Sequence, residues 1–287
     1  MSYLFKNLRR LLRFSPIEKV LFLFTEDRHS DNFFVKIAPG NNLYPSNSTR
    51  FVNRKGINYL LDISDYQNWL VYFGVNADRP EGLFELVKGK SVLIDVGANI
   101  GQTAMMFAKI AGENATILGF EPDPVNYSSA IVNLNKNKFA NIQYYNIGLG
   151  SQNETLPLKI NTPSNRGGNR MDRNGNPDSI PVTIERLDDV LKKKSISNVD
   201  LIKIDVEGFE LEVLKGAQHI LKHGNPVLFI EISDKNLREQ ETTPEEVFLF
   251  LTSLGYGIVN SITRKPVNEY PDLSGCHFDV ICAKQYL

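Results

Sequence analysis

The sequence is poor in three features that each mark a class of protein: cysteine, long apolar runs and an excess of charge of one sign. Only two of its 287 residues are cysteines, Cys276 and Cys282, which excludes a disulfide scaffold. We expect both to be reduced and partly buried thiols. The 32 basic and 33 acidic residues give a formal net charge of −1. This balance gives no global electrostatic reason to expect a nucleic-acid partner.

Apolar runs are too short to cross a membrane, since none reaches the roughly 20 residues that a bilayer requires. Charged residues interrupt positions 4–24, which does not fit a signal peptide, so a cytoplasmic location is expected. Residues 4–14 mix leucine and phenylalanine with four basic residues. We favour packing of this segment on its own domain or on a second copy of the chain in a homo-oligomer. Peripheral contact with an anionic membrane surface is the alternative.

An alternation of apolar strand-like runs with helical patterns begins near residue 90 and predicts a mostly parallel, seven-stranded sheet with helices on both faces. The last two strands are expected to close the sheet as an antiparallel pair. The predicted strands are 91–96, 116–120, 142–147, 200–205, 227–232, 256–260 and 278–283. The predicted helices are 102–111, 124–135, 185–193, 209–221 and 244–254.

The remaining parts of the chain show a weaker pattern. Residues 1–88 are predicted to be an α+β accessory region, with strands at 50–52 and 57–63 and a helix at 66–73, whereas 89–287 form the main domain. The polar segment 161–179 lies between two strands of a predicted hairpin. We interpret it as an exposed loop, with a substrate lid as the alternative.

The turn that joins the first strand to its helix predicts a ligand site. Gly97 and Gly101 let the backbone approach a ligand, and the helix start offers free N–H groups to an anion. Asp95 would repel a pyrophosphate but would attract the ammonium or sulfonium of S-adenosylmethionine. A tight structural turn is the alternative. The predicted cofactor-binding residues of this turn are Asp95, Gly97, Ala98, Asn99, Gly101 and Gln102.

A second acidic position ends the next strand. Glu121 lies 20 residues after Gly101, where a carboxylate can accept hydrogen bonds from both hydroxyls of a ribose. Asp123 already fits the N-cap of the following helix, which leaves Glu121 for a ligand. Pro122 and, after the third strand, Asn146 complete the predicted cofactor-binding set.

Three further acids are predicted to be catalytic. Asp205 and Glu207 follow a buried strand and can accept or orient the proton of an attacking hydroxyl. Glu231 stands late in another apolar strand, where an unpaired carboxylate is costly, so it should face the cleft or a cation. Helix capping and ion pairs to lysine are the structural alternatives. We assign no metal, although these acids with outside ligands could hold a divalent cation.

Taken together, these motifs resemble the FkbM family of methyltransferases. The resemblance rests on segments 95–101, 120–122, 187–189, 203–210 and 213–217, in matching order across roughly residues 90–260. It implies a Rossmann-like class I methyltransferase fold, S-adenosylmethionine as donor, and transfer to an oxygen of a small-molecule or glycan acceptor. It also assigns Asp95, Gly97, Asn99, Gly101 and Glu121 to the cofactor and Asp205 to the reaction.

Two other functions remain open at this point. A nicotinamide-dependent oxidoreductase shares the glycine turn and the distant acid, but it would have a glycine at Asn99 and no acid at Asp95. A non-catalytic carbohydrate-binding scaffold would not require the full set of Asp95, Glu121 and Asp205, so the presence of all three argues against it. Four aromatic residues of the accessory region could stack on a sugar or pack in a core: Tyr59, Tyr66, Trp69 and Tyr72.

Overall fold

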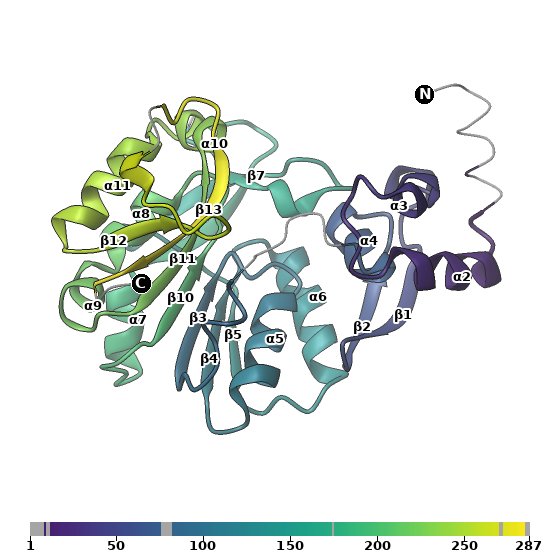
Figure 1. Ribbon diagram of the computed structural model, residues 1–287, viewed down its shortest axis with the longest axis horizontal. Coiled ribbons are helices and arrows are strands. Elements are labelled where there is room, and N and C mark those ends of the chain that lie inside the picture. The colour runs from purple at the N-terminus through teal and green to yellow at the C-terminus, as the bar shows by residue number, and fades with distance from the viewer. Residues whose placement is uncertain (1–8, 10–11, 76–81, 174, 270–271, 285–287) are drawn as a thin grey trace. The chain divides into compact units, whose positions relative to one another are not determined.

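The computed structural model describes residues 9, 12–75, 82–173, 175–269 and 272–284, which fall into two compact units (Figure 1). The first unit is Met1–Arg79 with Asn135–Asn137 and Asn161–Gly168, and the second is the rest of the chain. Residues 4–14 were predicted to pack on the domain or on a second copy, or to contact a membrane surface. Most of this segment lies outside the described residues. No helix of the described residues is long and apolar enough to cross a membrane.

A seven-stranded sheet forms the centre of the second unit, in the order β12-β13-β11-β10-β3-β4-β5 (Figure 1). Five neighbouring strands are parallel, and β13 runs antiparallel to both β11 and β12. The strands are β3 (Val92–Val96), β4 (Thr116–Phe120), β5 (Ile142–Tyr145), β10 (Leu201–Ile204), β11 (Val227–Ser233), β12 (Gly257–Asn260) and β13 (His277–Ala283). The predicted Rossmann-like sheet and its antiparallel closing pair are confirmed.

Helices cover both faces of this sheet, because successive side chains of its strands enter two separate cores. Leu93 packs with α5 and α6, whereas Ile94 packs with the helices of the other face. The helices are α5 (Gln102–Ala111), α6 (Pro124–Asn135), α7 (Leu187–Lys193), α8 (Glu210–Gly216), α9 (Gln218–His223), α10 (Asp234–Glu239) and α11 (Pro244–Ser253). Thr243 and Glu246 form a capping box at the start of α11.

The helix predicted at 209–221 is wrong as a single element, since it divides into α8 and α9 at Ala217. A Cβ on Gly216 would lie 1.9 Å from the carbonyl oxygen of Gly150, so this turn packs directly on another backbone. α10 was not predicted from the sequence.

A smaller sheet of the second unit has the order β6-β9-β7-β8. Its strands are β6 (Gly148–Leu149), β7 (Glu154–Lys159), β8 (Arg170–Met171) and β9 (Ile180–Glu185). The polar segment at 161–179 is thus partly structured, because it contains β8 and the 3-10 turn η2 (Arg166–Gly168). The prediction of a loop throughout is corrected at these residues.

The first unit contains the antiparallel pair β1 and β2 with short helices. Its elements are α2 (Ser15–Thr25), α3 (Phe33–Ile37), β1 (Thr49–Arg54), β2 (Ile57–Asp62) and α4 (Tyr66–Phe73). Tyr59, Trp69 and Tyr72 are buried, so they pack in a core and do not offer a face to a sugar. Tyr66 is exposed and stacks on Trp69. Leu83 and Val87, before the predicted boundary at residue 88, pack in the core of the second unit.

Candidate active site

The predicted site residues gather at the carboxyl edge of the large sheet. β3 lies between β4 and β10, so the direction in which strands are added reverses at β3. Ligands of open α/β sheets bind at such a point, beyond the carboxyl ends of the strands. The residues there are segment 95–101 from β3, Glu121 from β4, Asn146 from β5, Asp205 and Glu207 from β10, and Glu231 from β11.

The turn after β3 is held against the turn after β10. Gly97 has a φ of 75°, and a Cβ there would lie 1.8 Å from the carbonyl oxygen of Asp205. Asn99 and Gly101 also have positive φ, and Gly101 is the N-cap of α5 without a side-chain cap hydrogen bond. No acidic residue stands in the first turn of α5. The positive end of this ten-residue helix therefore faces the edge of the sheet without a side-chain carboxylate of its own.

Glu121 supports the same turn from the neighbouring strand. Its Oε2 accepts a hydrogen bond from the backbone N–H of Asn99 at 2.9 Å, and its Oε1 accepts one from Asp123 at 2.9 Å. Burial raises the pKa of Glu121 to about 7, although these two N–H groups oppose the rise. The side chain of Asn126 also hydrogen-bonds to this carboxylate. A carboxylate has about four acceptor positions, so about one remains for a ligand. The side-chain amide of Asn146 donates to the carbonyls of Glu121 and Pro122 at 2.9 and 3.0 Å.

Lys203 joins β10 to β3 at the reversal point and was not predicted as a site residue. Its Nζ lies 3.4 Å from Asp95 Oδ1 and 3.1 Å from Asp205 Oδ2, and it donates to the carbonyl of Gly97 at 3.2 Å. Burial alone would lower the pKa of Lys203, but Asp205 and Asp95 raise it above its usual range. Lysine is rarely buried without such partners. A lysine inside the apolar run 201–204 was the sequence signal that could have revealed it.

Asp95 has 0% of its surface exposed, and burial raises its pKa while Lys203 opposes the rise. The attraction of Asp95 to a cofactor cation stays a prediction, and the cation that Asp95 contacts in this structure is Lys203. Asp95 holds Lys203, and Lys203 in turn holds the turn at Gly97 and the carboxylate of Asp205.

Asp205 and Glu231 are neighbouring acids at the ends of β10 and β11. Glu231 follows Ile230, the register partner of Ile204, and so lies beside Asp205. The negative charge of Asp205, followed by burial and by Glu207, raises the pKa of Glu231 to about 10. Glu231 is therefore protonated at neutral pH, whereas Asp205 is ion-paired with Lys203.

Glu207 is committed to other side chains. It accepts a hydrogen bond from Asn236 at 2.7 Å and lies 3.7 Å from Arg170, and its φ is 55°. Among the residues that the structure describes, no group of three His, Cys, Asp or Glu side chains is arranged to hold a metal ion.

Glu210 holds the turn after β10 in place through hydrogen bonds, and it was also not predicted as a site residue. Its Oε1 accepts hydrogen bonds from the N–H groups of Val206 and Gly208 at 3.2 and 3.0 Å. Burial raises the pKa of Glu210 to about 7, against these two N–H groups. The carboxyl group thus binds its proton more tightly in the folded chain than in the unfolded one.

This linkage predicts how Glu210→Gln changes stability with pH. A raised folded-state pKa means that the stabilising contribution is complete below the unfolded value of 4.5 and is lost as pH rises through about 7. Glutamine keeps the accepting oxygen without the ionisation. Relative to the parent chain, Glu210→Gln should gain free energy of unfolding between pH 5 and pH 8, by at most about 3 kcal/mol. Urea unfolding at both pH values measures it, with exposed Glu245→Gln as control. An equal effect of Glu210→Gln at both pH values would contradict the assignment.

Comparisons with known proteins cover the part of the chain that forms this edge of the sheet. The family model of the methyltransferase FkbM domain matches residues 95–258, which begin at Asp95 and end in β12. The chain is 35% identical to the methyltransferase sdnD of Sordaria araneosa over 154 residues, covering 43% of this chain and 59% of that protein. It is 28% identical to the hexuronic acid methyltransferase AglP of Haloferax volcanii, covering 51% and 58%.

A third relative is the 2-O-methyltransferase NoeI of Sinorhizobium fredii, which is 26% identical and is covered over 54% of this chain and 68% of its own length. The chain spans less than two thirds of the length of sdnD and AglP. The family model, in contrast, matches more than half of this chain. The protein therefore belongs to the FkbM methyltransferase domain family.

Proposed function

We propose that the protein transfers a methyl group from S-adenosylmethionine to a hydroxyl of a saccharide or related natural product. The observation that carries the proposal is the braced turn at the strand reversal. Gly97 packs on the carbonyl of Asp205, and Glu121 holds the N–H of Asn99. This arrangement fixes the start of α5 and the carboxylate of Glu121 next to each other at the carboxyl edge of the sheet.

The residues present fit the donor by their chemistry. The start of α5 supplies N–H groups and a positive dipole end for the carboxylate of the methionine part. Glu121 retains an acceptor position for a ribose hydroxyl. Asn146 is exposed after the neighbouring strand β5, where we expect the adenine base of the cofactor. Ala98, Gln102 and Pro122 belong to the same turns. When bound, the cofactor supplies an electrophilic methyl group on a sulfonium.

The chain's own acids divide the remaining work. Asp205 is partly exposed and is the group that accepts the proton of the attacking hydroxyl. Lys203 holds the carboxylate of Asp205 in place. Protonated Glu231 donates a hydrogen bond to the acceptor, and Glu207, held by Asn236, orients it. Much of the acceleration comes from alignment of the hydroxyl with the methyl group.

The acceptor class rests on the site and on two relatives. Three carboxyl groups at one edge offer many acceptor atoms, which suits a ligand rich in hydroxyl donors. Two relatives carry names that point to sugars or to oxygen as the methylated atom, a hexuronic acid methyltransferase and a 2-O-methyltransferase. A saccharide hydroxyl accounts for both observations.

Transfer of a radiolabelled methyl group from S-adenosylmethionine to a panel of glycans and glycan extracts tests the proposal. Methylation of a hydroxyl gives an ether, which survives mild alkali, whereas methylation of a carboxylate gives an ester, which does not. We expect label in an alkali-stable product. Alkali-labile label would contradict the hydroxyl assignment, and label on protein or nucleic acid alone would contradict the acceptor class.

The raised pKa of Glu121 predicts that donor affinity depends on pH. The carboxylate form accepts a ribose hydroxyl, and it is lost as pH falls through about 7. Affinity for S-adenosylhomocysteine should therefore fall by up to about tenfold per pH unit below 7. Glu121→Gln should bind more weakly at pH 8 and show a flat profile from pH 5.5 to 8. Equilibrium dialysis measures both, and an unchanged pH profile in Glu121→Gln would refute the ribose role.

A further inference from the structure

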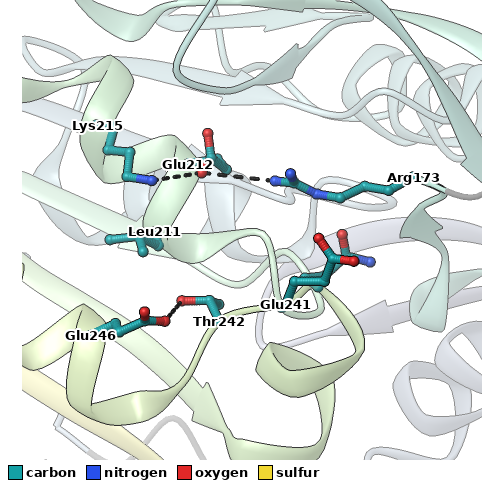
Figure 2. Close-up of a pocket in the computed structure, with 9 residues that line it drawn as sticks. Arg173, Leu211, Glu212, Lys215, Glu241, Thr242 and Glu246 are labelled. Carbon is teal, nitrogen blue, oxygen red and sulfur yellow. Dashed lines mark hydrogen bonds and ion pairs between the residues drawn. The ribbon is translucent and has the colours of Figure 1, made fainter.

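A cavity opens beside the turn that carries the proposed catalytic acids. Its volume is about 230 Å³, and Gly208, which follows Glu207, forms part of its wall. Leu211, Glu212 and Lys215 of α8 line one side (Figure 2). Residues 240–242 between α10 and α11 line the opposite side. The volume is below the roughly 300–1,000 Å³ of a drug-sized site, so the cavity suits a single small ring.

The charges around this cavity do not favour an anion. Glu212 lies between two cations, 2.9 Å from Lys215 and 3.8 Å from Arg173 (Figure 2). Both cations are thus already partnered. Glu241 and Glu246 add two carboxylates, and Glu246 accepts a hydrogen bond from the hydroxyl of Thr242 at 2.7 Å. Positively charged donors and negatively charged acceptors line the same small cavity. This mixture suits a neutral ligand with several hydroxyls.

Gln240 gives an independent sign that a donor is expected here. Its side chain lines the cavity and is only 7% exposed. Its Nε2 donates to the carbonyl of Met171 at 2.7 Å, which fixes the orientation of the amide. Its buried Oε1 accepts no hydrogen bond from the residues that the structure describes. A buried acceptor without a partner costs about 1–3 kcal/mol, so a ligand hydroxyl there would relieve that cost.

We propose that this cavity is a saccharide subsite that binds one pyranose ring of the acceptor, next to the ring that is methylated. The inference rests on the proposed function for its acceptor class. Gly208 stands three residues after Asp205 in one turn, so the cavity lies next to the turn that carries the proposed base. Gln240 and the carboxylates accept from the ring hydroxyls, and Leu211 contacts its apolar edge.

Saturation-transfer NMR of the full chain with methyl glycosides of glucose, galactose, mannose, rhamnose, fucose and glucuronic acid tests the subsite. Leu211→Trp fills the cavity, and Gln240→Met removes the acceptor at similar volume. Leu249→Trp on the exposed face of α11 and Gln218→Met on exposed α9 are the matched controls. We expect at least one glycoside to receive saturation in the parent chain and in both controls. Leu211→Trp should abolish the signal, and Gln240→Met should weaken binding about tenfold.

Two results would overturn the inference: no saturation of any glycoside in the parent chain, or unchanged saturation in Leu211→Trp. Thermal unfolding of each variant confirms that it is folded. Binding of S-adenosylhomocysteine, measured on the same samples, separates the two proposals. Glycoside binding without cofactor binding would leave the subsite standing and remove the proposed function, and the reverse would remove the subsite alone.

Discussion

Asp205→Asn is expected to lower kcat for methyl transfer by about 10²–10⁴-fold, the usual contribution of a positioned acid or base. Asparagine keeps the shape of the side chain but cannot take the proton of the acceptor hydroxyl. It also removes one of the two carboxylates that hold Lys203. In the proposed arrangement Asp205 contacts the acceptor hydroxyl, whereas Glu121 contacts the cofactor. The affinity for S-adenosylhomocysteine should therefore change little.

Glu231→Gln is the matched comparison, because Glu231 already carries its proton at neutral pH. Its pKa is raised to about 10, mainly by Asp205 and then by burial. Glutamine reproduces a neutral side chain with a donor, so kcat should stay within about threefold of the parent value. Initial rates of methyl transfer at pH 7.5 measure kcat for Asp205→Asn and Glu231→Gln. Equal losses in the two variants would contradict the division of roles between base and donor.

Gly97→Ala is expected to remove both donor binding and activity. The new Cβ would lie 1.8 Å from the carbonyl oxygen of Asp205, and the backbone has a φ of 75°. The turns after β3 and β10 must therefore separate, which displaces Asn99 from Glu121. We expect a loss of about 3 kcal/mol or more in the free energy of unfolding, since overpacking and an unfavourable φ act together.

Gly112→Ala is the control for the backbone conformation alone. Gly112 also has a positive φ, of 86°, but a Cβ there meets nothing within 4 Å. With a ψ of 175° this conformation is essentially restricted to glycine, so alanine should cost about 1–3 kcal/mol and leave donor binding intact. Urea unfolding and cofactor titration of both variants check the pair. If Gly97→Ala behaves like Gly112→Ala, the close contact between the two turns is not what shapes the site.

The sequence predicts the large sheet well because its strands are buried on both faces and its helices carry strong end signals. The capping box at Thr243 and the glycine at 112 place helix ends within a few residues. The family resemblance drawn from segments 95–101 and 203–210 is confirmed. With that family established, the nicotinamide-dependent alternative has no support.

The errors come from interactions between residues distant in sequence. Gly216 ends α8 because it packs on the carbonyl of Gly150, which no local pattern shows. β8 forms inside a polar segment because Met171 pairs with Leu158. Asp95 and Lys203 are register partners on neighbouring strands, so the burial of Asp95 and the site role of Lys203 emerge only from strand pairing. The roles of the individual site residues stay predictions.

Isothermal titration of the chain with S-adenosylmethionine and S-adenosylhomocysteine at pH 8 tests the central claim most directly. We expect one site per chain with micromolar affinity. Glu121→Ala should lose affinity for both compounds by at least tenfold. Glu113→Ala, which changes an exposed acid between α5 and β4, should lose no affinity. Absence of binding to either compound, or equal affinity in Glu121→Ala, would contradict a donor site at the strand reversal.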